Sequence, residues 1–249
     1  MDAYIINLDR APERWIHIQE TFASSTITPR RITAVDGNAI ALPHPDFDEK
    51  SFRLFHGRAI NIYEVACYFS HIKALRAFLE TEEKYALICE DDICLAPGFD
   101  ELITSLMNYS STWNIVRLTG LSQGKAFQIK KLISNYSVMV HLGRLKGAGA
   151  YLIDRKAAEI FVKRLLPMWL PWDHAIDREW FFGLKAFAVA PFPISQTNKK
   201  FRSAIQENSQ QKLSTLERWL TTYPYQMGNE LCRWFFRLES LLFSYRKSS

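Results

Sequence analysis

Several features that would assign this 249-residue sequence to a common class are missing from it. Its four cysteines form no C-x-x-C pair, so neither a zinc ribbon nor a disulfide framework is indicated. No run of about 18 apolar residues could span a membrane, and no basic segment precedes a long apolar stretch at the N-terminus. No G-x-G-x-x-G follows a strand and opens a helix, which argues against a dinucleotide fingerprint. We therefore expect a cytoplasmic protein that reaches a membrane only from its surface.

The excess of positive charge lies entirely at the end of the chain. The sequence has 31 Lys and Arg against 26 Asp and Glu, a formal charge of +5. Nine of the basic and four of the acidic residues lie in 199–249, which leaves 22 of each in the first 198. A neutral body gives little support to nucleic-acid binding, which needs a basic surface for the phosphates. We predict a main domain over 1–198 and a basic helical region over 199–249.

Strand-like and helix-like patterns alternate along the main domain. Apolar runs of strand length lie at 3–8, 31–35, 85–89, 113–118, 147–153 and 187–190, with shorter ones within 127–142. Apolar residues recur at helical spacing after Pro12, over 62–79 and over 157–165. Residues 38–58 carry two prolines and are expected to form a loop. The alternation predicts an α/β fold with a mostly parallel sheet and helices on both of its faces.

The sharpest local signal is Glu90-Asp91-Asp92, which directly follows the apolar run 85–89. Ligands of open α/β sheets bind beyond the carboxyl ends of the strands. Carboxylate oxygens are the ligands that Mn²⁺ and Mg²⁺ prefer. The triplet therefore predicts a site for Mn²⁺ (or Mg²⁺), with a solvated acidic turn as the alternative.

Four longer motifs resemble one known family. In chain order they are YIINLDRAPERW with AVDG, EVACYFSHIKAL, YALICEDDICLAPGF and GAGAYLIDRKAAEIF, followed by PWDHAID and PISQ. Together they span about residues 3–196 and resemble glycosyltransferase family 25, the lipopolysaccharide and lipooligosaccharide glycosyltransferases. The sequence departs from the family at Tyr63 and at Ala66-Cys67, where glycine is usual. The last fifty residues match no part of the pattern.

The resemblance implies a GT-A-like, nucleotide-sugar-binding fold and makes 1–198 the catalytic domain. It also implies a UDP-sugar donor, usually UDP-galactose or UDP-glucose, and an inverting transfer of the hexose to a lipid-linked oligosaccharide. On this sequence, Asp92 becomes the metal ligand, and Glu90 contacts the donor ribose or the water shell of the metal. Asp91 then binds the sugar or is structural.

Further donor contacts are expected after the first strand. Asn7, Asp9 and Arg10 lie where the uracil and ribose would be placed. Asp36 either meets the nucleotide or caps a turn.

Three more residues are candidate contacts to the donor. His71 is a substrate contact or a structural histidine. Gly147 and Gly149 allow close backbone approach to the sugar, or only turn the chain into a strand.

An inverting transfer needs a base that takes the proton of the acceptor hydroxyl. Asp173 and Asp177 are the candidates, because residues four apart share one face if Asp173 opens a helix. The alternative for Asp173 is a helix N-cap.

The C-terminal region predicts an amphipathic helix. One stripe of it is apolar (Leu231, Trp234, Phe235, Leu238, Leu242, Tyr245), and basic residues lie elsewhere (Arg233, Arg237, Lys247). Such a helix fits anionic lipid at the cytoplasmic face of the inner membrane. The alternatives are packing on the main domain or on a second copy in a homodimer.

Two other functions compete with the transferase. One is a non-catalytic saccharide-binding or membrane-associated scaffold protein that uses its aromatic side chains as stacking platforms. The other is a sugar nucleotidyltransferase, which is disfavoured because 7–10 contain no glycine for a phosphate loop.

Overall fold

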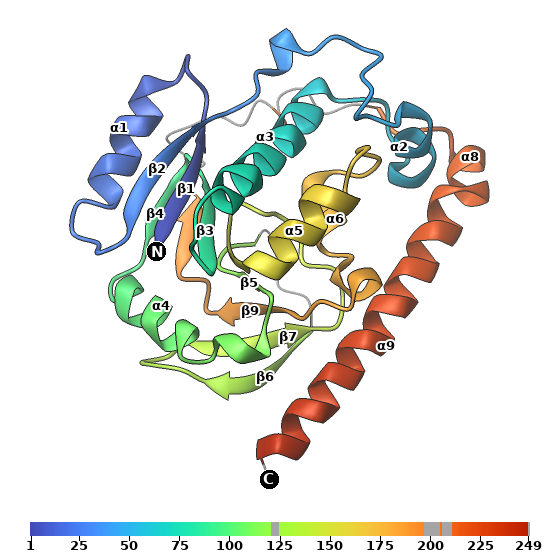
Figure 1. Cartoon of the computed structure of the whole chain (residues 1–249). Helices are drawn as coiled ribbons and strands as arrows, with labels where there is room; N and C mark the ends of the chain where they lie inside the picture. The colour runs from blue at the N-terminus through green and yellow to red at the C-terminus, as the bar shows by residue number, and fades with distance from the viewer. Residues whose placement is uncertain (121–124, 197–204, 206–210, 249) are drawn as a thin grey trace.

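The computed structural model describes residues 1–120, 125–196, 205 and 211–248, with side chains up to residue 242. Its centre is an eight-stranded sheet in the order β2-β1-β3-β8-β5-β9-β7-β6 (Figure 1). The strands are β1 Asp2–Asn7, β2 Thr28–Thr33, β3 Tyr85–Glu90, β5 Ile115–Arg117, β6 Ala126–Lys131, β7 Ser137–His141, β8 Ala150–Asp154 and β9 Ala186–Ala190. A separate two-stranded ladder joins β4 Ile93–Leu95 to β10 Ile194–Gln196.

Most strands of the large sheet run in one direction. β1 is parallel to β2 and β3, whereas β8 is antiparallel to both β3 and β5. β9 is parallel to β5, β7 is antiparallel to β9, and β6 is antiparallel to β7. Only β8 and β7 therefore oppose the other six strands. The prediction of an α/β fold with a mostly parallel sheet is confirmed.

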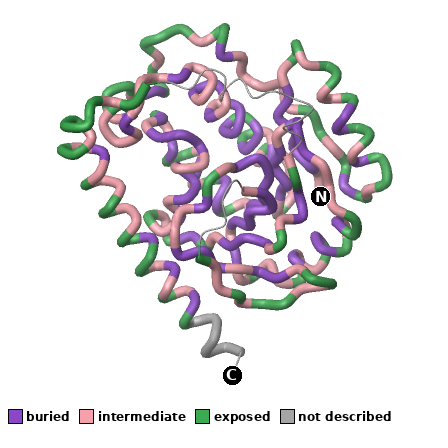
Figure 2. Tube along the Cα trace, turned by 180° about the vertical axis from the view of Figure 1, so that it is seen from behind, coloured by how far each residue is buried: buried purple, intermediate pink, exposed green. Residues whose placement is uncertain are grey.

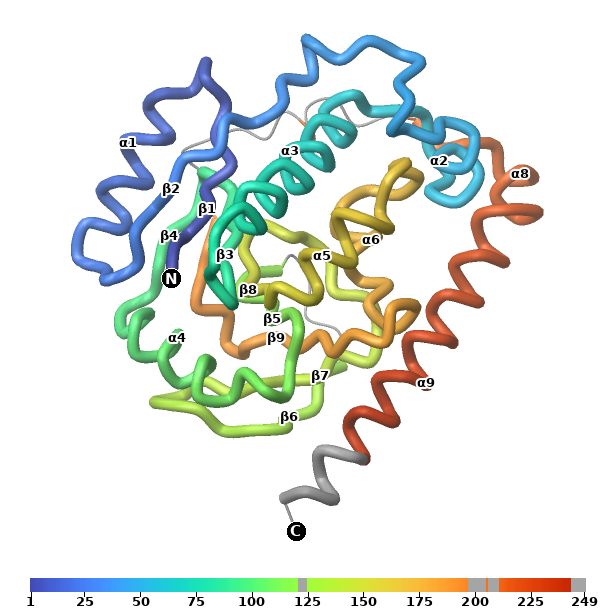
Figure 3. Tube along the Cα trace, in the orientation of Figure 1, coloured from blue at the N-terminus to red at the C-terminus, as the bar shows by residue number. Residues whose placement is uncertain are grey.

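Helices cover both faces of the sheet because the strands are apolar on both sides. Tyr4 and Ile6 of β1 pack under α3 Ile62–Leu79, α5 Arg155–Arg164 and α6 Trp172–Ile176. Ala3 and Ile5 point to the other face, which α1 Pro12–Thr21 and α4 Phe99–Met107 cover. Figure 3 follows this order along the chain.

The prediction of a loop over 38–58 is wrong in part. Helix α2 Glu49–His56 begins there, because the side chain of Asp48 accepts a hydrogen bond from the amide of Ser51 at 2.9 Å. Gly57 ends the helix in the left-handed region at φ 75°. The prolines of this segment precede α2 and leave its backbone hydrogen bonds intact.

The C-terminal region is helical, as predicted, but it packs differently. The short helix α8 Thr215–Leu220 is followed by α9 Thr222–Ser248, which lies along the main domain. Figure 2 shows buried residues on the inner side of α9 and exposed ones on its outer side. None of the helices in the described part of the chain is long and apolar enough to cross a membrane.

The expectation that Arg233 and Arg237 belong to an exposed basic face is wrong. Their side chains are 0% and 5% exposed, because both reach acidic groups of the main domain. The apolar stripe is the outer face instead, with Leu231 and Phe235 52% and 64% exposed. On its inner side α9 packs through these arginines and through apolar side chains: Leu241 is buried, and Leu238 and Tyr225 lie against the core of the main domain. The side chains of Tyr245 and Lys247, and residues 197–204 and 206–210, lie outside the described part.

Candidate active site

A cleft with two chambers opens beyond the carboxyl ends of β1 and β3. The larger chamber has a volume of about 400 Å³, and the smaller one about 240 Å³. They meet at residues that line both (Cys67, His71, Glu90, Asp92, Ile205). The larger chamber holds Arg10, Arg14 and Tyr63. The smaller chamber holds Glu64, Gly147, Gly149 and Asp173, and no Lys or Arg among its described lining residues.

The sheet topology brings distant segments to this edge. Because β8 is antiparallel to β3, the beginning of β8 lies beside the end of β3, and the amide of Glu90 donates to the carbonyl of Gly149 at 2.8 Å. The ladder of β10 and β4 pairs Gln196 with Ile93. A Cβ on Gly149 would lie 2.7 Å from Nε2 of Gln196, so a side chain at this position would displace the amide of Gln196.

All three members of the acidic triplet line the larger chamber, and Glu90 and Asp92 also line the smaller one. Nε2 of Gln196 lies 3.2 Å from Oε2 of Glu90 and 3.5 Å from Oδ1 of Asp92. Burial raises the pKa of Glu90 to about 7, and the neighbouring carboxylates Asp91 and Asp173 add to this effect. Burial, Glu90 and Asp91 raise the pKa of Asp92 to about 7. Buried oxygen ligands that repel one another are a donor set that a divalent cation fits.

Asp91 has a different environment from its neighbours. Its carboxylate accepts hydrogen bonds from Nδ2 of Asn7 at 2.8 Å and from Nη1 of Arg14 at 2.9 Å. Its side chain is buried, and the pair with Arg14 joins the strand end to α1. These contacts favour the structural alternative for Asp91.

Asn7 and Asp9 lie outside both chambers. Asn7 is completely buried, and its amide also donates to the carbonyl of Ala11 and accepts from Nε of Arg31. Asp9 is exposed and forms an ion pair with Arg31 at 2.8 Å. Asn7 therefore supports Asp91 from behind, and neither side chain lines the cleft.

Arg10 and Asp36 form an ion pair of 2.8 Å at the rim of the larger chamber. Asp36 also accepts from the amide of Asn38 and caps a short 3-10 helix, Gly37–Ala39. The Asn38 amide, followed by Arg10, lowers the pKa of Asp36. Asp36 therefore caps a turn, and Arg10 is the member of the pair that lines the cleft.

His71 lies at the junction of the two chambers. Its ring is fully buried, stacks on Trp172 at 4.9 Å and places Nδ1 3.2 Å from the hydroxyl of Tyr151. The preceding Ser70 accepts from the amide of Val35 and donates to the carbonyl of Ala66. Ser70 thus connects Val35, in the wall of the larger chamber, to α3. The next residue, His71, places Nε2 3.8 Å from Oε1 of Glu90.

Asp173 lies in the first turn of α6 and lines the smaller chamber. The N-cap of α6 is Pro171, so Asp173 is not the cap; it accepts instead from the amide of Gly147 at 3.0 Å. Burial opposes its ionisation, but His174, the Gly147 amide and Arg117 outweigh burial and lower its pKa. An ionised carboxylate in this position can accept a proton. The backbone of Gly147 has a φ of 83°, in the left-handed region that favours glycine, and this conformation presents its amide to Asp173.

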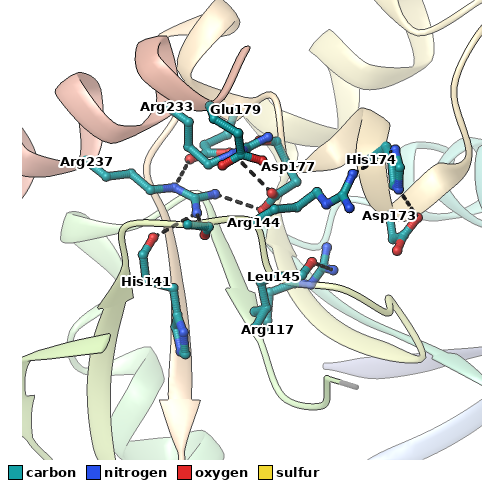
Figure 4. Close-up of polar contacts among 12 residues, drawn as sticks. Arg117, His141, Arg144, Leu145, Asp173, His174, Asp177, Glu179, Arg233 and Arg237 are labelled. Carbon is teal, nitrogen blue, oxygen red and sulfur yellow. Dashed lines mark hydrogen bonds and ion pairs between the residues drawn. The ribbon is translucent and has the colours of Figure 1, made fainter. Parts of the chain in front are cut away.

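The structure does not bring Asp177 to Asp173. Asp177 ends α6, and its carboxylate lies 2.8 Å from Nη2 of Arg237 and 3.1 Å from Nε of Arg233 (Figure 4). Arg237 also pairs with buried Glu179 at 2.6 Å. The expectation that Asp173 and Asp177 share one face of a helix is wrong, because α6 has only five residues. Asp177 belongs to a buried ion cluster below α9.

This ion cluster reaches the site through the loop 142–147. Arg237 donates to the carbonyls of His141 and Gly143 at 2.8 and 2.9 Å. From the other side, Arg117 donates to the carbonyls of Leu145 and Gly147. Because the Gly147 amide binds Asp173, α9 and β5 together support the loop that holds this carboxylate (Figure 4).

Sequence patterns do not identify some of the site residues. Gln196 belongs to the motif PISQ, but its contacts with Glu90 and Asp92 depend on the pairing of β10 with β4. Glu64 shares a helix face with His71, yet its environment is set by folding: burial, followed by Asp173, raises its pKa to about 7. Arg117 and Arg144 carry no local signal.

The fold and the cleft define the class of protein. It is an α/β protein with a mostly parallel sheet and carboxylates clustered beyond the ends of its strands. The sequence pattern of glycosyltransferase family 25 (LPS biosynthesis protein) matches residues 1–176. The chain belongs to glycosyltransferase family 25.

Individual relatives are distant. A glycosyltransferase 25 family member of Drosophila melanogaster is 24% identical over 238 residues, which cover 84% of this chain and 38% of that protein. This chain thus spans little more than a third of that relative. The lacto-N-neotetraose biosynthesis glycosyltransferase LgtE of Neisseria meningitidis serogroup B is 24% identical over 214 residues, covering 80% of this chain and 72% of that protein. A solved glycosyltransferase involved in glycosylating the major capsid of PBCV-1 is 12% identical, covers 75% of this chain and 80% of its own, and has a TM-score of 0.39.

Proposed function

We propose that this chain is an inverting glycosyltransferase that moves a hexose, galactose from UDP-galactose, onto a lipooligosaccharide or lipopolysaccharide acceptor. The observation that carries the proposal is the placement of Asp173 in the chamber that adjoins Glu90 and Asp92. A candidate base and a candidate metal site thus flank one space. Family membership and the similarity to LgtE support the substrate class.

The two chambers suit the two halves of a nucleotide sugar. The larger one offers the ring of Tyr63 and the apolar Val35 to a uracil, and Arg10 and Arg14 to the phosphates. The smaller one offers the carboxylates of Glu64 and Asp173, which accept hydrogen bonds from sugar hydroxyls. Phosphates would be repelled from the smaller chamber, so the charges orient the donor along the cleft.

Mn²⁺ (or Mg²⁺) fits the oxygen ligands of Asp92 and Glu90. When bound, the ion would neutralise the charge that develops on the departing UDP. Glu90 and Asp92 have pKa values raised to about 7. A cation would favour their ionised forms. Gln196, within reach of both, would hold the two side chains toward the cleft.

Asp173 acts as the base of the proposed reaction. Its carboxylate accepts the proton of the acceptor hydroxyl as the oxygen attacks the anomeric carbon, and the bond from that carbon to the UDP oxygen breaks. The Gly147 amide holds Oδ2 at 3.0 Å, and Oδ1, which lies 4.0 Å from Nε2 of His174, is the oxygen that we assign to the acceptor. A positioned base of this kind contributes roughly 10² to 10⁴ in rate.

A donor screen tests the proposal. The chain is incubated with Mn²⁺, a truncated lipooligosaccharide and, in separate reactions, UDP-galactose, UDP-glucose or their N-acetyl analogues, and released UDP is measured. We expect acceptor-dependent release to be fastest with UDP-galactose. No release with any donor would favour the non-catalytic saccharide-binding function. Faster release with UDP-glucose would keep the transferase and change the sugar.

The exposed stripe of α9 is the proposed contact with the cytoplasmic face of the inner membrane, where the acceptor is anchored. Leu231, Trp234, Phe235 and Leu242 are all at least 42% exposed. Exposed apolar side chains along one face of a helix suit the interface of a bilayer.

A further inference from the structure

Three potential metal ligands of different chemistry meet where the two chambers join. They are Sγ of Cys67, a ring nitrogen of His71 and a carboxylate oxygen of Glu90, and these atoms all lie within 4.8 Å of one another. Cys67 and His71 are four residues apart on α3 and therefore share a face of the helix. Glu90 ends β3 on the opposite wall. All three residues line both chambers, so an ion entering the cleft can reach them.

His71 points an unused nitrogen at this position. Its Nε2 is buried, has no hydrogen-bond partner among the described residues, and lies 3.8 Å from Oε1 of Glu90. The other nitrogen faces the hydroxyl of Tyr151 at 3.2 Å, and the ring is fixed by stacking on Trp172. A histidine that ligates a metal commonly donates its second ring N–H to a neighbouring group. With the Nδ1 proton on the Tyr151 side, the lone pair of Nε2 faces Glu90.

We propose that Cys67, His71 and Glu90 form a binding site for Zn²⁺, with a fourth position open to the cleft. One sulfur, one imidazole nitrogen and one carboxylate oxygen are a set that zinc accepts in tetrahedral geometry. Mn²⁺ and Mg²⁺ prefer oxygen ligands, so this set differs from that of Asp92. The two sets share Glu90 and cannot both use it fully.

Small side-chain movements suffice to close the site. Zinc bonds of about 2.0 to 2.3 Å place tetrahedral ligand atoms roughly 3.3 to 3.8 Å apart. The ligand atoms, now within 4.8 Å of one another, would approach by about 1.5 Å at most. Glu90 can turn on its flexible side chain, whereas His71 is already held in place. The thiol proton of Cys67 leaves to solvent when the Zn–S bond forms.

The consequence for the proposed reaction is inhibition. Zinc at this position withdraws Glu90 from the Mn²⁺ ligands and occupies the junction through which the donor passes. Only this inhibition rests on the proposed function. Zinc can bind to the three ligands whether or not the chain transfers a sugar. Zn²⁺ is expected to lower Mn²⁺-dependent transfer at least tenfold at saturation.

Co²⁺ titration of the reduced, full-length chain tests the site. We expect one equivalent of Co²⁺ to give the charge-transfer absorption of a cobalt–thiolate bond. Cys67→Ser should abolish the band, and His71→Gln should weaken Co²⁺ binding at least tenfold. The matched control is Cys232→Ser, an exposed cysteine on α9 that should keep the band. A band that survives in Cys67→Ser, or none in the native chain, overturns the proposal.

Two further measurements keep the test independent of folding and of the proposed function. The zinc-edge X-ray absorption spectrum of the native chain should show one sulfur ligand, and a shell without sulfur contradicts the proposal. Asp92→Asn should lose Mn²⁺-dependent UDP binding yet keep the cobalt–thiolate band. Loss of the band in this variant would show that the ion is held by the acidic triplet instead.

Discussion

Nη2 of Arg237 lies 2.8 Å from the carboxylate of Asp177 and joins the C-terminal helix to the end of α6. Both side chains are at least 94% buried, and Arg237 also binds Glu179 and the carbonyls of His141 and Gly143. Burial alone would lower the pKa of Arg237, but Glu179 and Asp177 outweigh it and raise the pKa. The arginine therefore stays charged and pairs with two buried carboxylates, of which Asp177 is also bound by Arg233.

Removing this arginine should destabilise the protein strongly. Arg237→Ala leaves Asp177 and Glu179 buried and short of a partner, and breaking such a pair costs about 3 to 5 kcal/mol. The free energy of unfolding, measured with urea, should fall by that amount. Arg76→Ala, an exposed arginine on α3, is the control and should change it by less than about 0.5 kcal/mol. Equal effects of the two substitutions would contradict the assignment of α9 to the folded core.

The two candidate bases should respond differently to the same substitution. Asp173→Asn keeps the size of a side chain that lines the smaller chamber, so we expect normal UDP binding and a kcat lower by roughly 10² to 10⁴. Asp177→Asn should instead lower stability while the remaining folded protein keeps its kcat. Steady-state kinetics and urea unfolding of both variants separate these effects. Unchanged turnover in Asp173→Asn would transfer the role of base to Glu64, the carboxylate of that chamber that takes no part in the proposed metal site.

Metal binding should strengthen as pH rises. Glu90 and Asp92 have ordinary pKa values of 4.5 and 3.8, and the fold raises both to about 7. Between about pH 4 and 7 the folded state holds protons that the unfolded state has released, so without metal the stability falls as pH rises through this window. Mn²⁺ needs the ionised carboxylates, and its Kd should be at least about tenfold lower at pH 8 than at pH 6.

Glu90→Gln provides the control for this pH effect. The variant removes one of the two titrating groups, so the change in Mn²⁺ Kd between pH 6 and 8 should shrink. Without metal, the variant should be more stable than the native chain at pH 8, because a neutral amide replaces a partly buried carboxylate that Asp91 and Asp173 repel. A native Kd that does not change between pH 6 and 8 would rule out the raised pKa values.

The apolar stripe of α9, and not its arginines, should govern membrane binding. The double variant Leu231→Ser, Phe235→Ser should reduce sedimentation with anionic liposomes at least fivefold and leave UDP binding unchanged. Glu239→Gln, an exposed residue of the same helix, is the control. Because Arg233 and Arg237 are buried, binding should vary little with salt. Undiminished sedimentation of the double variant would contradict the membrane proposal. If the native chain is a dimer and the two substitutions dissociate it, the stripe is a dimer interface instead.

The sequence predicts the parts of the fold that depend on local patterns. The runs that form β1, β3 and β5 and the spacing that forms α3 are visible because each element buries a regular set of apolar side chains. Helix α2 was missed because its start depends on one capping hydrogen bond from Asp48 within a segment containing prolines. The antiparallel insertion of β8 between β3 and β5 was also invisible, since strand order is set by packing between distant segments.

The sequence likewise predicts those parts of the candidate site that follow from local patterns, and not those that depend on packing between distant segments. Glu90 and Asp92 follow a strand, and ligands of such sheets lie beyond the strand ends, so their position could be inferred. The separation of Asp173 from Asp177 could not, because it depends on α6 ending after five residues and on Arg237, sixty positions later. The inward orientation of the α9 arginines depends on acidic partners that no local pattern identifies.

Calorimetric titration of the full-length chain with UDP, in the presence and absence of Mn²⁺, tests the central claim most directly. The claim is that the cleft beyond the carboxyl ends of β1 and β3 binds a nucleotide through a metal held by Asp92 and Glu90. We predict one UDP per chain with Mn²⁺, at least tenfold weaker binding without it, and no Mn²⁺ effect in Asp92→Asn. The exposed Asp46→Asn should behave as the native chain does. UDP binding of equal strength with and without Mn²⁺, or an undiminished Mn²⁺ effect in Asp92→Asn, would contradict the claim.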